Sequence, residues 1–229
     1  MIEEPPLLRI KSTRQRPTDQ QIAAFQGVAT GFVNDALDGA GALSSRIAPL
    51  PEQEGQVAGP ALTCDSGPGD ILALLALLKF TQPGDIAVNA FAGYQEAATA
   101  GDRVTGMLRN AGAAALVTDG PTRDHAGIRA VGLPVWCTGL TPASPVSKGP
   151  GTVGFPVQLG GQQVATGDMI VADRDGVVVV PFAKIDTVIE RLDHIRTLED
   201  ALDAEVANGL AIPLSITELL ESDQVQYSD

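Results

Sequence analysis

Short apolar segments alternate with segments of helical periodicity between residues 57 and 138, and this alternation limits the fold more than any other feature. The segments with strand character are 57–64, 85–90, 113–118 and 133–138. The segments with helical character are 71–79, 96–110 and 124–131, the second weakened by Gly101 and Gly106. Strands separated by helices connect as parallel crossovers, so the sequence predicts an α/β fold with a parallel core.

The pattern changes to that of antiparallel hairpins after residue 154. Gly160-Gly161 separates strand-like segments at 155–159 and 162–165, and a turn at 174–176 separates 169–173 from 177–180. Short glycine-containing connections of this kind are typical of β-hairpins, so we expect a mixed sheet. Asp173-x-Asp175-Gly176 resembles the start of a calcium loop, but valines follow where further ligands would stand, which indicates a turn.

Helices are expected before and after this core along the chain. Thr18 with Gln21 has the pattern of a capping box, which predicts a helix to about residue 26, and a second helix is expected over 31–37. Residues 182–208 form a long amphipathic helix with an apolar stripe. The stripe consists of Ile185, Val188, Ile189, Leu192, Ile195, Leu198, Leu202 and Val206. It would cover either the chain's own sheet or a partner chain.

The chain shows no linker between residues 57 and 181 and no internal repeat, which favours a single domain over 1–229. Its parts are an N-terminal arm (1–17), an α/β core (57–181) and C-terminal helices (182–222). The arm mixes prolines with basic residues and has no period, so we expect it to be loose or laid on a neighbouring subunit.

The charge balance argues against nucleic acid as a partner. Fifteen basic residues against 28 acidic ones give a net charge of −13, which repels nucleic acid.

The longest helix-like apolar run, 71–78, is too short to span a membrane. The acidic, proline-broken N-terminus is unlike a signal peptide. Cys64 and Cys137 are interpreted as reduced thiols, so a cytoplasmic location is expected.

One apparent motif and the two histidines do not by themselves indicate a binding site. Residues 149–154 match G-x-G-x-x-G, but a strand rather than a helix follows, so we interpret the segment as a mobile loop. The two histidines, His125 and His194, are too few for a histidine-rich metal site. His194 is expected on the surface of the long helix, whereas His125 stands beside the segment considered next.

Residues 119–124, Asp-Gly-Pro-Thr-Arg-Asp, follow an apolar strand. Ligands bind at the carboxyl ends of parallel strands, and the Gly120-Pro121 turn would present Arg123 and Asp124 there. An adjacent arginine and aspartate also occur as a plain surface ion pair. Gly101-Asp102, twenty residues earlier, strengthens the functional interpretation, because a helix start offers free N–H groups and Asp102 adds a second carboxylate.

These residues together suit a 2-oxo acid. Asp124, with Asp102 directly or through water, would hold a divalent cation that chelates the acid. Arg123 would face the oxygen of the developing enolate. Backbone groups from Gly101 through Arg103 to Val104 would receive the carboxylate. A lysine Schiff base is disfavoured, because none of the four lysines lies in this set.

At these positions the sequence resembles the RraA-like family, over about residues 25–209. The matching motifs are Gly59-Pro60-Ala61-Leu62-Thr63, Pro83-Gly84-Asp85, Gly101-Asp102, Asp119-Gly120-x-x-Arg123-Asp124, Gly161, Gly167-Asp168 and Asp173-x-Asp175-Gly176-Val177. The family includes class II aldolases of 4-hydroxy-4-methyl-2-oxoglutarate and 4-carboxy-4-hydroxy-2-oxoadipate, which also decarboxylate oxaloacetate. The resemblance therefore implies a metal-dependent lyase that releases pyruvate.

The resemblance also implies an α/β/β/α sandwich of the swivelling-domain type, assembled as a homotrimer or homohexamer. It makes Asp124 the Mg²⁺ or Mn²⁺ ligand, Asp102 the holder of metal-bound waters, and Arg123 the catalytic group that binds the oxo acid. Glu199 matches a glutamate that reaches the metal shell of an adjacent subunit; a solvated glutamate is the alternative. The competing function is a non-catalytic regulator that binds a protein partner; a quinone methyltransferase has less support, because no methyl-donor glycine loop is present.

Two positions depart from the family pattern. Ile71 stands where the aldolases usually have asparagine, and Leu75 where a polar or basic residue is common. If both faced the substrate, they would not satisfy a distal carboxylate, and the natural substrate would differ. A buried helix face is the simpler explanation. The sequence leaves open the exact oxo acid, the choice of metal and the number of subunits.

Overall fold

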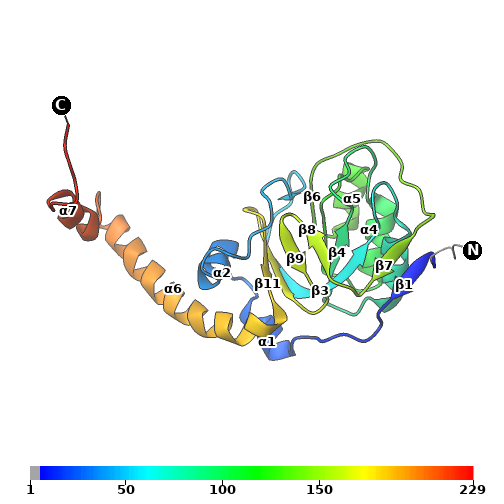
Figure 1. The fold of residues 1–229 in the computed structure, drawn as a ribbon, viewed down its shortest axis with the longest axis horizontal. Coiled ribbons are helices and arrows are strands. Elements are labelled where there is room, and N and C mark those ends of the chain that lie inside the picture. The colour runs from blue at the N-terminus through cyan, green and yellow to red at the C-terminus, as the bar shows by residue number, and fades with distance from the viewer. Residues whose placement is uncertain (1–5, 229) are drawn as a thin grey trace, which may run out of the picture.

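A mixed β-sheet forms the centre of the molecule in the computed structural model, which describes residues 6–228 (Figure 1). Its strands follow the order β1-β7-β3-β4-β5-β6-β2. They are β1 (Leu8–Ile10), β2 (Ala48–Pro49), β3 (Val57–Asp65), β4 (Ile86–Ala90), β5 (Ala115–Thr118), β6 (Val135–Cys137) and β7 (Gly151–Val153). The strands β3, β4, β5 and β6 are parallel neighbours, as the alternating pattern predicts.

Two antiparallel hairpins follow the parallel strands, both where the glycine turns predict them. The first joins β8 (Val157–Leu159) to β9 (Gln162–Val164), and the second joins β10 (Met169–Ala172) to β11 (Val177–Val180). The strand β10 also pairs antiparallel with the first half of β3. The predicted turn at 174–176 is confirmed, because it joins β10 to β11, and the Asp173 carboxylate accepts the backbone N–H groups of Asp175 and Thr30.

Helices cover both outer sides of the β-layers (Figure 1). They are α1 (Asp19–Ala24), α2 (Thr30–Ala36), α3 (Leu72–Leu77), α4 (Asp102–Asn110), α5 (His125–Val131), α6 (Ile185–Ala207) and α7 (Leu214–Leu220), with 3₁₀ turns at Leu78–Phe80 and Phe182–Lys184. The predicted capping box of α1 is present, with Thr18 and Gln21 bonded reciprocally.

Three buried apolar clusters hold these layers together. One lies between α3, α4, α5 and the sheet, and a second, around Trp136, lies between the sheet and the hairpin strands. A third joins α1, α2 and α6 to the β10–β11 hairpin. Apolar burial of this kind is the main stabilising term in folding, and its order gives an α/β/β/α arrangement. The mixed α/β fold expected from the sequence is confirmed.

The N-terminal arm follows a path that the sequence did not predict. Within the described part of the arm, β1 pairs in parallel with β7 of the same chain. Arg14 donates to the fully buried carboxylate of Asp85 at 2.7 Å, and Arg16 forms a second ion pair with it. Along residues 8–16 the arm is therefore not loose but is held on its own chain. Residues 1–5, including the acidic start of the chain, lie outside the described residues.

Two further segments differ from the sequence-based expectation. The helix expected over 96–110 begins only at Asp102, because the preceding residues are bonded to loops instead of to a helical turn: the N–H of Ala98 donates to Ala143 O, and that of Thr99 to Pro121 O. The segment 149–154, interpreted as a mobile loop, contains β7, which pairs with both β1 and β3. In both cases distant segments supply the backbone partners.

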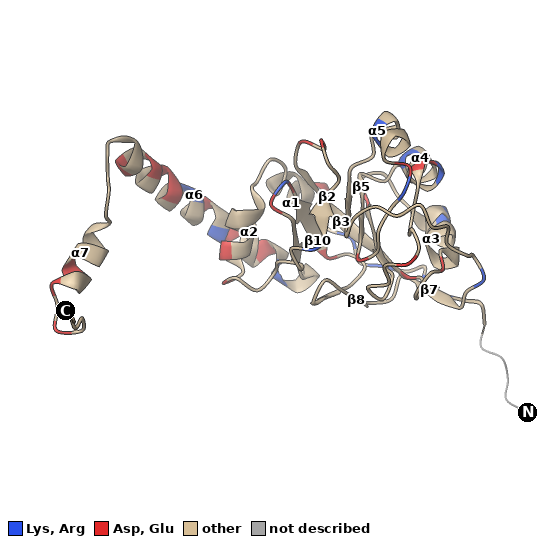
Figure 2. Cartoon of the chain, turned by 90° about the horizontal axis from the view of Figure 1, so that it is seen from above, with Lys and Arg blue, Asp and Glu red and all other residues tan. Residues whose placement is uncertain are grey.

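The apolar stripe of the long helix α6 covers the chain's own layers in its first half only. Ile185, Val188 and Leu192 are buried against the chain's own layers, whereas Leu198 and Leu202 are 55% and 43% exposed. The outer half extends away from the β-layers and carries many acidic side chains (Figures 1 and 2). Among the described residues, no helix combines the length and the apolar character that a bilayer crossing requires.

Candidate active site

The segment 119–124 lies at the carboxyl end of β5, between two other loops. The N–H of Arg123 donates to Ala100 O at 3.0 Å, which ties the segment to the start of α4. On its other side the N–H of Thr122 donates to Gly139 O, and that of Thr141 donates to Thr122 O, both at 2.9 Å. These bonds place the segment between the residues before α4 and those after β6.

The start of α4 presents free backbone donors beside this segment. Gly101 is the N-cap residue and makes no side-chain cap bond, so the N–H groups of the first turn lack helical partners. The hydroxyl of Thr105 donates to Gly101 O and Asp102 O. Asp102 is the first helical residue, where a negative side chain interacts favourably with the helix dipole.

Arg123 and Asp124 are held in a defined geometry. The Nε of Arg123 lies 3.3 Å from Oδ2 of Asp124, and Nη1 donates to Oγ of Ser144 at 2.6 Å. Asp124 precedes α5 with φ of 56°, a left-handed conformation that is rare for a residue with a side chain. Its carboxylate does not cap the helix, so its oxygens remain directed at the site. Strain of this kind concentrates at functional sites.

Two glycines allow the charged residues to come together. A methyl group on Gly101 would collide with Oδ2 of Asp124 and would lie 3.1 Å from Cγ of Arg123. A methyl group on Gly127, in α5, would lie 2.6 Å from Cβ of Asp102. The starts of α4 and α5 therefore meet, and they bring Asp102 next to the Arg123–Asp124 pair.

The donor chemistry of this junction fits a hard divalent cation. Both carboxylates are free of helix caps, and their oxygens are the ligands that Mg²⁺ and Mn²⁺ prefer. Among residues 6–228 no group of three or more histidine, cysteine or acidic side chains is arranged to hold a metal. Mg²⁺ commonly binds through one or two carboxylates and keeps several waters, so two aspartates are a sufficient protein contribution.

The other predicted site residues lie at different distances from the junction. Val104 is buried, and Arg103 is exposed on the first turn of α4. Glu199 is half-buried in the second half of α6. This half of the helix extends away from α4 and α5 in this chain (Figure 1). Glu199 would reach such a junction only on another copy.

The remaining side chains that the sequence singled out have structural surroundings. Ile71 and Leu75 are half-buried and pack against the cluster under α3, in agreement with the simpler explanation of both. His125 forms a hydrogen bond with Pro51 O at 3.1 Å, and His194 is exposed on α6. Cys64 and Cys137 are free and buried, and burial raises the pKa of both thiols, which makes them poor nucleophiles.

Sequence reasoning missed the loop that follows β6. A cavity of about 310 Å³ is lined by Arg123, Asp124, His125, Leu140, Thr141 and Pro142. Ser144, from the same loop, bonds Arg123. The loop lacks a recognisable motif, and its one usable signal was its position after a parallel strand, where ligand-binding residues gather.

The fold and the site define a class of protein: an α/β protein with a mixed sheet, whose two aspartates and arginine meet near the carboxyl ends of parallel strands. A family model named RraA-like, described as Aldolase/RraA, matches residues 30–179, and the chain belongs to this family.

Individual relatives agree with this membership. The chain is 35% identical over 189 residues to a protein of Halalkalibacterium halodurans named "Putative 4-hydroxy-4-methyl-2-oxoglutarate aldolase", covering 82% of this chain and 90% of the relative. The structure of RraAS2 from Streptomyces coelicolor, described as an unusual member of the RNase ES inhibitor RraA protein family, is 30% identical with a TM-score of 0.73, covering 83% of this chain and all of that one. The RNA-processing inhibitor RraA from Thermus thermophilis, 22% identical with a TM-score of 0.62, covers 68% of this chain and 94% of its own and supports the fold.

Proposed function

We propose that this protein is a divalent-metal-dependent aldolase that cleaves a 4-hydroxy-2-oxo dicarboxylic or tricarboxylic acid, releases pyruvate, and also decarboxylates oxaloacetate. The observation that carries the proposal is the meeting of Asp102, Arg123 and Asp124 at the adjoining starts of α4 and α5. The similarity to a relative named as an aldolase supports it. Both reactions generate the enolate of pyruvate, so one site serves both.

Arg123 and the first turn of α4 would bind the substrate. Its carboxylate would accept the N–H groups from Asp102 to Val104, which have no helical partners. The guanidinium of Arg123 would donate to the keto oxygen and stabilise the negative charge that develops there as the C–C bond breaks. Ser144 would keep the guanidinium in place through its bond to Nη1.

Asp124, together with Asp102 through water, would hold Mg²⁺ or Mn²⁺ beside the substrate. When bound, the cation polarises the carboxylate and keto oxygens of a 2-oxo acid and lowers the energy of its enolate. Asp124 fits this role, because its carboxylate is half exposed and does not cap α5.

Asp102 would take part in proton transfer. Aldol cleavage requires removal of the proton on the substrate's 4-hydroxyl, and Asp102 would accept it through a water. Oxaloacetate lacks this hydroxyl and loses carbon dioxide instead. We therefore expect Asp102 to matter more for aldol cleavage than for decarboxylation.

We further propose that the active unit is a homotrimer or homohexamer in which Glu199 reaches the site of an adjacent copy. The apolar residues exposed on the outer half of α6 support an interface there, since patches of this kind mark association surfaces. Glu199 lies on this half of the helix.

A non-catalytic regulator that binds a protein partner is the second candidate. The likeness to RraAS2, which is described within a family of RNase inhibitors, favours it. Such a protein would use its surface and would not need two carboxylates and an arginine at one junction. Catalysis with defined metal dependence therefore separates the two candidates.

The test is pyruvate release from oxaloacetate, 4-hydroxy-4-methyl-2-oxoglutarate and 4-carboxy-4-hydroxy-2-oxoadipate, with Mg²⁺ and with EDTA. We expect activity only with the metal, and Arg123→Ala or Asp124→Ala to lower the rate at least about 10³-fold, roughly 4 kcal/mol of barrier. Asp102→Ala should slow cleavage of the hydroxylated substrates more than decarboxylation.

Arg129→Ala is the matched control, because Arg129 is an exposed arginine on α5 that pairs with Glu52 outside the junction. It should retain wild-type activity. Full activity in EDTA would contradict the metal assignment, and absence of pyruvate from all three substrates would favour the regulator.

A further inference from the structure

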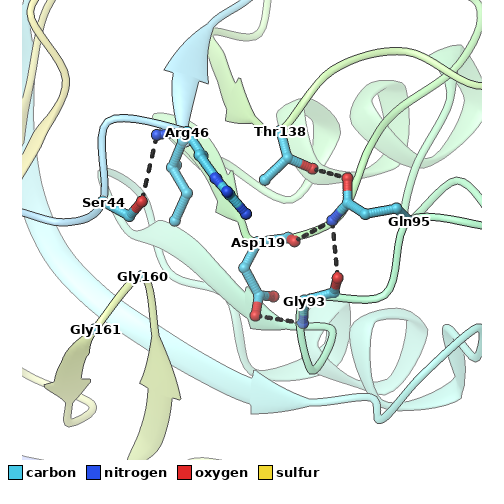
Figure 3. A pocket seen from close by; sticks show the side chains of 9 residues that line it. Ser44, Arg46, Gly93, Gln95, Asp119, Thr138, Gly160 and Gly161 are labelled. Carbon is cyan, nitrogen blue, oxygen red and sulfur yellow. Dashed lines mark hydrogen bonds between the residues drawn. The ribbon is translucent and has the colours of Figure 1, made fainter.

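A second cavity, of about 430 Å³, lies at the same edge of the sheet (Figure 3). Its lining comprises Ser44, Arg46, Ile47, Gly93, Gln95, Asp119, Thr138, Gly160 and Gly161. Asp119 follows β5 and Thr138 follows β6, while Gly160 and Gly161 form the turn of the β8–β9 hairpin. The volume is within the range of about 300–1,000 Å³ that is typical of small-molecule sites.

This cavity is separate from the one at Arg123. The two share no lining residue. Ile47 belongs to the buried cluster between the sheet and the hairpin strands, whereas α4 and α5, which form the Arg123 junction, cover the other face. A ligand in the second cavity would therefore leave the Arg123 junction open.

Asp119 contributes a carboxylate to the lining of the cavity. Its two carboxylate oxygens accept the backbone N–H groups of Phe91 at 2.6 Å and Gly93 at 2.8 Å, which fixes their orientation. Each oxygen keeps a lone pair for another donor. Burial raises the pKa of this carboxyl, and the two N–H bonds partly offset the rise.

Arg46 lies across the cavity from Asp119. Figure 3 shows its side chain extended over the hollow toward that carboxylate. Among the ion pairs within 4.0 Å in residues 6–228, none includes Arg46. A cation and a carboxylate thus face each other without contact, and the guanidinium retains donors suited to a planar anion.

The polar wall between them is already satisfied internally. The Gln95 amide donates to Gly93 O at 2.9 Å and Asp119 O at 3.1 Å, and it accepts the hydroxyl of Thr138 at 2.8 Å. Ser44 donates its N–H to Gly160 O at 2.7 Å, which joins the hairpin turn to the loop that carries Arg46. The wall sets the shape of the cavity, and the groups with hydrogen-bonding capacity left for a ligand are the Arg46 guanidinium and the remaining lone pairs of Asp119.

We propose that this cavity binds a small carboxylic acid that also carries a hydrogen-bond donor, with the carboxylate on Arg46 and the donor on Asp119. The donor is a hydroxyl in a hydroxy acid or an ammonium in an amino acid. Both present the same pair of groups, so the two sources are separated by experiment.

The test measures binding to the full chain in EDTA by saturation-transfer NMR, with four three-carbon probes: lactate, alanine, propionate and lactamide. We expect lactate or alanine to bind at least about tenfold more tightly than propionate, which lacks the donor, or lactamide, which lacks the charge. The preference between lactate and alanine identifies the donor. The measurement involves no turnover, so its result is independent of the proposed aldolase activity.

Arg46→Met should weaken binding of the preferred probe at least about tenfold, because it keeps an apolar stem and removes the guanidinium. Arg46 is exposed, so this change should not affect folding, which circular dichroism would verify. Arg174→Met, an equal loss of charge at an exposed arginine in the turn between β10 and β11, should leave affinity unchanged. The proposal is overturned if Arg46→Met binds as tightly as the wild type, if propionate matches lactate and alanine, or if no probe binds.

Discussion

Gly101 and Gly127 lack functional groups, yet the positions of three charged side chains depend on them. Gly101 has φ of −134°, a conformation open to any residue, so its requirement for glycine comes from space rather than from backbone freedom. The carboxylate of Asp124 and the stem of Arg123 occupy the volume that a side chain would fill. Close packing of this kind has no tolerance for an added methyl group.

Gly101→Ala should therefore displace Asp124 and Arg123 and lower metal-dependent pyruvate release about 10²-fold, since misplacement by about 1 Å has an effect of this size. Steady-state kinetics would measure it. Gly106→Ala, in the same helix, is the control: its methyl group would lie 3.8 Å from Val131, an ordinary contact. That change should keep activity and add up to about 1 kcal/mol of stability, because alanine favours helix. Equal activity of both variants would argue against a crowded junction.

The N-terminal arm acts as a structural element, although it contains only a three-residue strand. It adds β1 to β7 at the edge of the sheet and places two arginines on Asp85, whose side chain is fully buried. Asp85 also accepts the N–H of Gln82 at 2.8 Å. A buried carboxylate without cations is strongly unfavourable, so the arm and the start of β4 stabilise each other.

Replacing both Arg14 and Arg16 by alanine should lower the free energy of unfolding by roughly 3–5 kcal/mol, because it leaves the buried charge of Asp85 uncompensated. Urea-induced unfolding would measure the loss. Arg9→Ala is the control within the arm, since Arg9 is exposed and stacks over Phe155 at 5.1 Å, a contact worth at most about 1 kcal/mol. A double variant as stable as Arg9→Ala would show that the arm is not held by Asp85.

The molecule as a whole combines a net charge of −13 with an exposed apolar stripe on α6. The charge disfavours association in general, whereas the stripe would favour it at one place. Acidic residues are frequent along α6 (Figure 2), so a partner surface there would need apolar residues with cations around them.

Changing Leu198, Leu202 and Val206 together to glutamine should convert the proposed trimer or hexamer to a chain of 23.6 kDa, measured by light scattering after size-exclusion chromatography. Met107→Gln, which removes an exposed apolar side chain from α4, should leave the mass unchanged. A wild-type mass of one chain at micromolar concentration would contradict the assembly.

Sequence patterns were sufficient to predict the parallel strands, both hairpins and the capping box at Thr18. They were also sufficient to nominate Asp102, Arg123 and Asp124 as one set. These features depend on residue periodicity, turn chemistry and the general placement of loops at strand ends, and all three act over short distances along the chain.

Only the tertiary structure determined the path of the N-terminal arm, the late start of α4, the strand at 151–153 and the second cavity. Each depends on a partner that local patterns do not reveal. Arg14 bonds a carboxylate 71 residues away, and the N–H groups before α4 are taken by loops after β5 and β6. Because a buried polar group must find a partner wherever the fold supplies one, such contacts override local preference and become visible only once the chain is packed.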